Sequence, residues 1–250
     1  HQVDATDWQQ RIGSAYPFIS QRFLAALEDS GCIGDDSGWD PLYVLVDGAE
    51  PFALLTFIKQ HSYGEYVFDW SWADAYHQHG IGYYPKLLCG APFTPATGPR
   101  ILTPATPSQQ QLTLATQVLT ELCQQYQLSG WHLNFFESQL QPLFADTQAH
   151  IRLGCQFHWH NRHYQSFEHF LQSFRSSKRK NVLKERHRVQ QHIQLSRLTG
   201  GDISADDISE FYRCYQLTYL KRHSSGYLNE AFFQQLRISL IDQMLLVKAQ

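Results

Sequence analysis

The pattern of apolar and polar positions predicts a chain that mixes helices with strands. Residues 20–30 carry apolar side chains at helical spacing, and Gly31 follows as a stop signal. Two apolar runs, Leu42–Val46 and Phe52–Lys59, flank an Asp-Gly turn, which predicts a β-hairpin. The aromatic run Tyr66–Trp72 alternates and is predicted as a third strand. Strands that follow one another without helices between them indicate an antiparallel region.

The middle of the chain is predicted to hold a long irregular loop and then a clear helix. Glycine and proline are frequent from Gly80 to Arg100, where a short helix is predicted at Tyr84–Leu88. After Pro107 one apolar stripe at helical spacing predicts a helix. The next three segments are predicted as strand, short helix and strand: Trp131–Phe136, Gln139–Asp146 and Ile151–His160.

A new unit is predicted to begin at Ser166, the N-cap of a helix, with a second helix starting at Ser176 or Ser177. The elements after it are predicted as strand, helix, helix and strand: Ile193–Leu198, Ser204–Arg222, Asn229–Ile241 and Met244–Ala249. Ser204 and Asp207 have the spacing of a capping box. The last strand has no sheet partner after it, which predicts a chain cut inside a domain.

Composition and charge narrow this picture. With 43% hydrophobic residues in 250, the chain can form a real core, and its apolar runs are too short to span a bilayer. The chain opens on His1 without a signal peptide, and its natural N-terminus is expected to be missing. The net charge of −3 conceals an asymmetry: residues 1–150 carry 5 Lys and Arg against 15 Asp and Glu, whereas residues 151–200 carry 10 against 2. Either the two regions face each other, or the basic one binds phosphate or carboxylate groups.

Cysteines and histidines give weaker signals. Five widely spaced cysteines without a C-x-x-C motif predict reduced thiols in a cytoplasmic protein. His158 and His160 share one strand face, and His77 and His79 form a similar pair. No third ligand follows at a recognisable spacing, so a metal-dependent enzyme is the least favoured hypothesis.

The basic region contains the clearest candidate binding site. Seven cations lie within 14 residues: Arg175, Lys178, Arg179, Lys180, Lys184, Arg186 and Arg188. Three of them fall in the first turn of the predicted helix, where the helix dipole already places positive charge. An anion such as phosphate would make this arrangement favourable. The alternative is a solvated basic face.

The proline-rich loop is a second candidate. Thr94 and Thr97 supply hydroxyl groups, while Lys86 and Arg100 are two of the five cations in the first 150 residues. Because prolines reduce the entropy cost of holding one shape, the loop is predicted to form a rigid pocket wall. The alternative is a proline-rich connector.

Two residues are candidate proton carriers. Asp69 lies among aromatic residues, which would raise its pKa and suit a general base; it could equally be a capping or turn carboxylate. His132 shares a predicted strand face with Asn134 and is either a proton carrier or a satisfied core histidine.

Several of these segments together resemble the FemAB-like proteins, which are related to the GNAT acyltransferases. The segments are Tyr83–Leu87, Pro92–Arg100, His132–Phe135, Ser166–Phe167 and Ser177–Lys180. The resemblance implies an α+β fold of tandem GNAT-like (acyl-CoA N-acyltransferase) domains, each a mixed, mostly antiparallel sheet flanked by helices. The first domain would span residues 1–165, and residues 166–250 would be the truncated opening of the second.

The resemblance also implies transfer of an acyl or aminoacyl group from acyl-CoA or aminoacyl-tRNA to an amine, such as one on a peptidoglycan precursor. No firmly bound cofactor is implied. Residues 78–82 are one residue short of the acetyltransferase pyrophosphate loop, which argues against ordinary acetyl-CoA use by the first domain. The alternative is a non-catalytic module that binds an anionic cell-wall precursor or tRNA.

Roles follow from this hypothesis for the candidate residues. Asp69 or His132 would take the amine proton. The acceptor pocket would be lined by Tyr84, Lys86, Thr94, Thr97 and Arg100. Phosphates would be held by Lys178, Arg179, Lys180 and Arg186.

Overall fold

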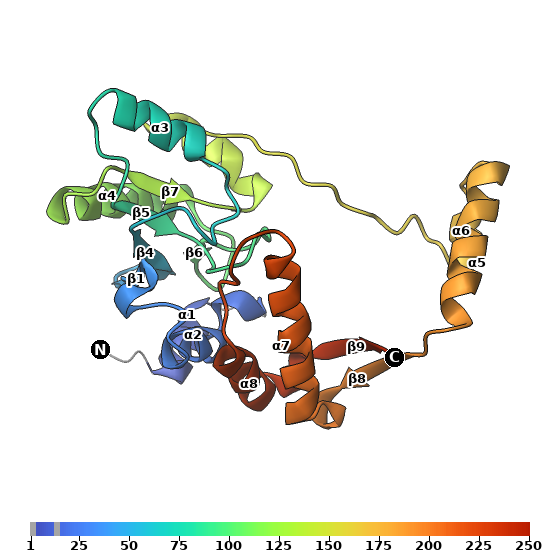
Figure 1. The fold of residues 1–250 in the computed structure, drawn as a ribbon. Coiled ribbons are helices and arrows are strands. Elements are labelled where there is room, and N and C mark those ends of the chain that lie inside the picture. Colours follow the sequence, from blue (N-terminus) through green and yellow to red (C-terminus); the bar gives the residue numbers. More distant parts are fainter. Residues whose placement is uncertain (1–3, 13–15) are drawn as a thin grey trace. The chain divides into compact units, whose positions relative to one another are not determined.

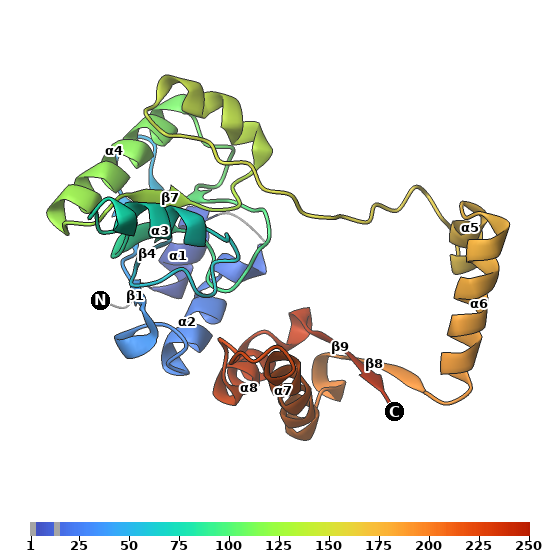
Figure 2. The ribbon, with the colours of Figure 1, turned by 45° about the horizontal axis from the view of Figure 1, so that its top comes forward.

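A computed structural model describes residues 4–12 and 16–250, which divide into two compact units. The first unit combines the chain up to Arg152 with Ser204–Ile241, and the second combines Leu153–Ile203 with Asp242–Gln250. Helices and strands occur together in both units (Figures 1 and 2), which confirms a mixed α and β protein. The tandem GNAT-like domains, residues 1–165 and 166–250, stay a prediction, because compactness alone does not define them.

Two sheets form the centre of the first unit. The four-stranded sheet has the order β1-β4-β5-β7, and the three-stranded sheet has the order β2-β3-β6. Of the strand pairs described in these sheets, β5 and β7 are parallel and the others are antiparallel. The strand bounds are β1 Trp39–Pro41, β2 Val44–Val46, β3 Phe52–Leu54, β4 Thr56–Lys59, β5 Lys86–Cys89, β6 Ile101–Leu102 and β7 Trp131–Leu133.

Helices cover the sheets through two apolar clusters. Leu88 belongs to the cluster formed with α1, α2 and α8, whereas its neighbours Leu87 and Cys89 belong to the cluster formed with α4. This alternation follows from the two-residue period of a strand. The helix bounds in this unit are α1 Ala5–Ile12, α2 Gln21–Asp29, α3 Trp70–Gln78, α4 Gln109–Gln125, α7 Ala205–Leu220 and α8 Glu230–Ser239.

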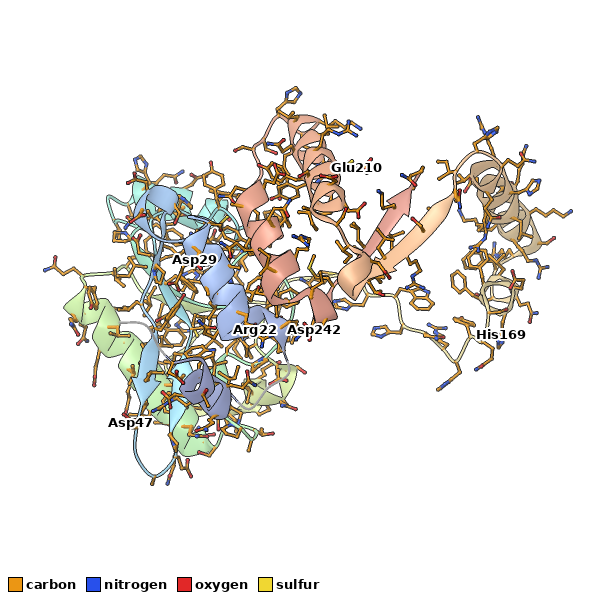
Figure 3. All side chains as sticks on the ribbon, turned by 90° about the horizontal axis from the view of Figure 1, so that it is seen from below. Arg22, Asp29, Asp47, His169, Glu210 and Asp242 are labelled. Atoms are coloured by element: carbon orange, nitrogen blue, oxygen red, sulfur yellow. The ribbon has the colours of Figure 1, made fainter. Side chains whose placement is uncertain are left out.

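Local sequence signals explain where these helices begin. Ser20 accepts a hydrogen bond from the Phe23 amide at the start of α2, and Ser108 forms a full capping box with Gln111 at the start of α4. The predicted capping box of Ser204 and Asp207 is confirmed at α7. Arg22, on α2 (Figure 3), donates to the carbonyl of Ser239 and so connects α2 to the end of α8.

Short 3-10 turns complete the first unit. They are η1 Pro17–Ile19, η2 Asp35–Ser37 and η3 Ser138–Asp146; η5, Ile241–Gln243, spans the boundary between the units. The short helix predicted at Gln139–Asp146 is therefore present in 3-10 form.

The second unit contains a helical hairpin and a β-ribbon. Helix α5 spans Phe167–Gln172 and α6 spans Ser176–Gln190, and Ser166 caps α5 as predicted. Strands β8, Leu195–Thr199, and β9, Leu245–Ala249, pair antiparallel, with the 3-10 turn η4, Gly200–Asp202, after β8. The final strand, β9, therefore pairs with β8, which precedes it in the chain.

Four sequence predictions were wrong in detail. Residues 66–72 are not a strand: Tyr66 has a left-handed φ of 57°, and α3 begins at Trp70. The helix predicted at residues 84–88 is wrong: strand β5 begins at Lys86, and a short, wholly buried segment has no periodicity that separates helix from strand. Residues 151–160 have no regular structure, and residues 52–59 form two strands that separate at Leu55 and enter different sheets.

Candidate functional site

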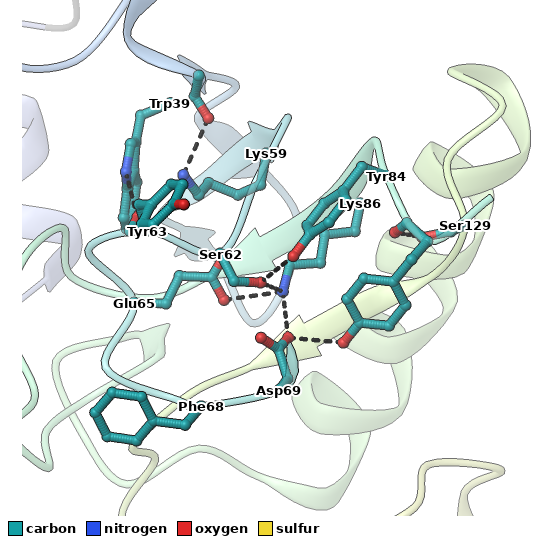
Figure 4. A network of polar contacts seen from close by, with 12 residues as sticks. Trp39, Lys59, Ser62, Tyr63, Glu65, Phe68, Asp69, Tyr84, Lys86 and Ser129 are labelled. Carbon is teal, nitrogen blue, oxygen red and sulfur yellow. Dashed lines mark hydrogen bonds and ion pairs between the residues drawn. The ribbon is translucent and has the colours of Figure 1, made fainter. Parts of the chain in front are cut away.

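The ammonium group of Lys86 is the centre of a buried polar cluster in the first unit (Figure 4). Its Nζ donates to Ser62 Oγ at 2.8 Å, to Glu65 Oε2 at 3.0 Å and to Asp69 Oδ2 at 2.7 Å. The side chains of all three charged residues are fully buried. An ammonium has three N–H bonds, and all three are used here. Lys86 therefore acts as a fixed positive charge that organises its neighbours, which we call the Lys86 cluster.

Asp69 is held as an ion by this cluster. It occupies the position before α3, yet it makes no capping hydrogen bond, because its Oδ2 accepts from Lys86 and from the Tyr83 hydroxyl at 2.7 Å. Burial alone would raise the pKa of Asp69, but the hydrogen bonds from Lys86 and Tyr83 outweigh burial and lower it. The sequence predicted a raised pKa for Asp69, and the structure gives the opposite direction. Its role in proton transfer stays a prediction.

A second carboxylate makes the cluster electrostatically unusual. Glu65 is 4% exposed, and burial raises its pKa more than the nearby charge of Lys86 lowers it. Glu65 Oε1 and Asp69 Oδ1 are buried without a hydrogen-bond partner among the described residues. Two carboxyl groups therefore compete for one ammonium, and each keeps one oxygen available.

Ser62 connects the Lys86 cluster to a pocket. Its Oγ lies 2.7 Å from the Tyr84 hydroxyl and also accepts from Lys86. Ser62 lines a pocket of about 350 Å³. Glu65 and Asp69, the other described residues whose side chains hydrogen-bond to Lys86, do not line this pocket. The other lining residues come from two distant stretches of the first unit: Gly64, Tyr66, Val67, Phe68, Trp70, Thr218, Tyr219, Arg222, Ser224 and Tyr227.

Lys59 is a second buried cation beside the Lys86 cluster. Its Nζ donates to the Gly38 carbonyl at 3.0 Å and lies 3.7 Å from the centre of the Trp39 ring. Burial lowers the pKa of Lys59 to about 7, which the nearby charge of Glu65 only partly offsets. The Trp39 ring and one carbonyl thus replace water around this ammonium.

His132 lies on β7, where it pairs with Leu88 of β5, and its ring centre is 6.0 Å from that of Tyr83. Burial and, to a lesser degree, the charge of Lys86 lower its pKa to about 4. The imidazole is therefore neutral at physiological pH and has a lone pair that can accept a proton. Its role as a proton carrier stays a prediction.

The proline-rich loop is held mainly through its backbone. The Arg100 guanidinium donates to the carbonyls of Asn134, Pro99 and Ala96, at 2.6, 2.9 and 2.8 Å, and Arg100 is 2% exposed. Thr94 is buried and donates to the Pro92 carbonyl at 2.9 Å. Thr97 is exposed. Of the predicted acceptor-lining residues, Lys86 and Tyr84 both hydrogen-bond to Ser62. The other three, which are the two threonines and Arg100, belong to the proline-rich loop.

The predicted phosphate-binding residues lie on α6 in the second unit. Lys178, Arg179 and Lys180 occupy its first turns, as predicted, and no side chain caps the helix start at Arg175. Arg186 lies further along α6, with its guanidinium 4.1 Å from the centre of the Phe167 ring. Lys178 and Arg186 are eight residues apart, or about 12 Å along a helix. The two could hold separate phosphates of one ligand, and their role stays a prediction.

The described residues contain neither a metal-binding cluster nor a helix that could span a membrane. Among residues 4–12 and 16–250, no group of three or more His, Cys, Asp or Glu side chains is arranged to hold a metal ion. His158 and His160 stack with ring centres 6.1 Å apart, without further ligands nearby in the described chain. No helix in the described part of the chain is both long and apolar enough to cross a bilayer.

Sequence reasoning missed several residues of this site. Ser62, Glu65 and Tyr83 carry no motif, and they reach Lys86 only through contacts between residues far apart in the chain. Arg222 lies at the end of α7 and contributes to the pocket together with residues more than 140 positions earlier. The aromatic residues of Tyr66–Trp72 are the signal that the sequence offers here, and their alternation predicts a strand instead.

Comparison with known proteins gives one match. A family model for FemAB-like proteins, described as peptidoglycan biosynthesis/recognition, matches residues 1–250. No curated protein and no solved structure matches the chain significantly.

Proposed function

The chain belongs to the FemAB-like family, and from this premise we propose that it transfers an acyl or aminoacyl group from a phosphate-bearing donor to an amine. The family description connects the chain to peptidoglycan biosynthesis, which supports a transferase and makes a peptidoglycan precursor the natural acceptor. Acyl-CoA and aminoacyl-tRNA are the candidate donors, and both place the reaction in the cytoplasm. The tandem GNAT-like fold is part of this proposal.

The observation that carries the proposal is the position of Ser62 between the pocket and Lys86. Ser62 Oγ accepts one N–H from Lys86, so its own hydroxyl hydrogen can point to Tyr84, to the Asp69 carboxylate or to a ligand in the pocket. A donor's carbonyl oxygen placed there would accept a hydrogen bond from a hydroxyl polarised by a buried ammonium. Fixed donors of this kind stabilise the negative charge that develops on the carbonyl oxygen during acyl transfer.

The bond changes then balance without a further reactant. The amine nitrogen attacks the carbonyl carbon, a C–N bond forms, and the C–S bond of a thioester or the C–O bond of an aminoacyl ester breaks. The amine loses one proton, and the leaving thiolate or alkoxide takes one up. The proposal assigns the amine proton to His132, which is neutral but a weak base because burial lowers its pKa to about 4. Asp69 is the alternative: its Oδ2 accepts from Lys86 and Tyr83, and its Oδ1 has no partner among the described residues.

The remaining predicted residues complete the proposal. Thr94 and Arg100 would maintain the loop, and Thr97 would offer its exposed hydroxyl to the acceptor. In the second unit, Lys178, Arg179, Lys180 and Arg186 would bind phosphate groups through exposed or partly exposed side chains on α6.

The test is product formation by the whole chain and its dependence on Ser62. The protein would be incubated with acyl-CoA or aminoacyl-tRNA and a panel of amines that includes peptidoglycan precursor peptides, and the products measured by mass spectrometry. We expect Ser62→Ala to lower kcat by ~100-fold with a smaller effect on KM, since loss of one such donor has an effect of about this size. Ser62→Thr, which keeps a hydroxyl, should recover part of the rate.

Ser71→Ala is the matched control, because Ser71 is an exposed serine on α3 outside the pocket lining. Equal losses in the Ser62 and Ser71 variants would remove the role of Ser62. Ligand binding without product from either donor would reject transfer in favour of a non-catalytic module for an anionic cell-wall precursor or tRNA.

A further inference from the structure

The pocket beside Ser62 has an uneven distribution of charge. Among the described residues that line it, Arg222 is the one ionised side chain, and none is a carboxylate, a lysine or a histidine. The Arg222 guanidinium makes no hydrogen bond or ion pair with the described residues. The pocket thus extends from a buried hydroxyl, Ser62 at 5% exposure, to an exposed guanidinium without a partner.

Aromatic rings form most of the pocket wall. Tyr227 packs edge-on against Tyr66 and Tyr219, with ring centres 6.1 Å and 5.8 Å apart, and these contacts fix one part of the wall. Phe68 and Trp70 also line the pocket but remain 75% and 43% exposed. Figure 4 shows Phe68 directed away from the Lys86 cluster. Large exposed apolar side chains at a pocket are a common mark of a ligand site.

The charge and the shape of the pocket together indicate which chemical class of ligand it binds. A guanidinium presents parallel N–H donors that match the two oxygens of a carboxylate. One cation balances one negative charge, whereas a pyrophosphate would bring more negative charge than this lining can neutralise. The aromatic rings would cover an apolar body attached to the carboxylate, and the volume suits a ligand between an amino acid and a dipeptide in size.

We infer that this pocket binds the part of the acceptor that carries a single carboxylate next to an apolar body, such as the C-terminal residue of a peptide whose reacting amine lies elsewhere in the molecule. The carboxylate pairs with Arg222, and the apolar part contacts Phe68 and Trp70. This inference rests on the proposed function in one respect, because it identifies the substrate class of the site that contains Ser62.

The experiment measures binding alone and needs no turnover. The probes are N-acetylphenylalanine, its uncharged amide and phenyl phosphate, titrated into the whole chain by calorimetry. We expect the acid to bind ~10-fold or more tightly than the amide, as is typical of a hydrogen-bonded charge pair. Arg222→Gln should remove this preference, whereas Arg213→Gln, an exposed arginine on α7 outside the lining, should retain it. Trp70→Ala should weaken acid and amide equally.

Three results would overturn the inference. These are equal binding of acid and amide, an unchanged preference in Arg222→Gln, and tighter Arg222-dependent binding of phenyl phosphate, which would assign the pocket to a phosphate instead. Absence of binding by every probe also counts against it. Transfer activity is measured separately: product formation without carboxylate preference would reject this inference alone, and carboxylate binding without product would reject the proposed function alone.

Discussion

Lys59 and Lys86 lie directly opposite each other on the antiparallel strands β4 and β5, and both are fully buried. Side chains at opposed positions point to the same face of a sheet, so the two positive charges are neighbours. Each is balanced differently: Lys86 by two carboxylates, and Lys59 by a carbonyl and the Trp39 ring. The free energy of unfolding should therefore depend on the charges that surround these two lysines.

Replacing Lys86 should be strongly destabilising. Lys86→Met leaves Glu65 and Asp69 buried without their cation, and we expect the free energy of unfolding to fall by ~3–5 kcal/mol. Urea denaturation followed by tryptophan fluorescence measures this change. Lys221→Met, at an exposed position, is the control. Adding Asp69→Asn to Lys86→Met should recover part of the loss, and a loss below ~1 kcal/mol in the single variant would contradict this account.

Lys59 should make stability rise with pH. Its pKa falls from 10.5 to about 7 on folding, so between pH 7 and 9 the unfolded chain binds more protons than the folded one. The free energy of unfolding should therefore increase with pH in this window, by at most ~1.4 kcal/mol per pH unit. Denaturation at pH 7, 8 and 9 tests this, and Lys59→Met should flatten the dependence. An equal rise in that variant would assign the effect to other groups.

His132 should remain neutral in mildly acidic solution. Because burial lowers its pKa to about 4, its imidazole NMR signals should stay constant from pH 8 down to pH 5. If His132 accepts the amine proton, loss of kcat/KM through its protonation should begin only near pH 4 to 5. His132→Gln identifies the signals. A titration midpoint near 6.5 would show that the imidazole is hydrated in the folded protein.

Gly64 should be needed for the shape of the pocket. Its φ is +80°, and a Cβ at this position would lie 2.6 Å from the Phe93 ring. Gly64→Ala should therefore lower the free energy of unfolding by ~1–3 kcal/mol and weaken ligand binding. Gly130→Ala is matched, since that glycine has no positive φ and no heavy atom within 4 Å of the added carbon. Similar stability in the two variants would contradict the steric argument.

The basic helix should bind polyanions through its first turns. Replacing Lys178, Arg179 and Lys180 with alanine should weaken tRNA binding at low salt by at least ~10-fold. The slope of log K against log salt concentration should also become shallower, by the amount expected for the loss of about three phosphate contacts. Fluorescence anisotropy at several salt concentrations measures both. The control replaces Lys184 and Arg188, later on the same helix. Weakening in proportion to the number of cations removed, three against two, would indicate a diffuse basic face.

Local signals in the sequence predicted the local structure well. The apolar spacing before Gly31 and after Pro107 predicted α2 and α4, and Ser20, Ser166 and Ser204 were each found at a helix start. These features depend on residues within a few positions of one another, which a sequence displays directly.

The candidate site could be predicted only in part, for a physical reason. The sequence predicts separate roles for Lys86 and Asp69, whereas the structure joins the two side chains at 2.7 Å. Their contact depends on the left-handed backbone at Tyr66 and on the start of α3 at Trp70, where alternating aromatic residues imitate a strand. Burial of a charge is a property of the assembled fold, so no local pattern reveals it.

The backbone contacts of Arg100 have a consequence for tolerance to substitution. Its guanidinium holds the main-chain carbonyls of residues 96, 99 and 134, and every amino acid supplies such a carbonyl. The side chain at position 96 can therefore be exchanged, to introduce a probe or alter acceptor preference, while the path of the loop is preserved. Position 100 has no such freedom, because lysine lacks the planar set of donors that reaches three carbonyls at once. The loop can be redesigned around a single fixed arginine.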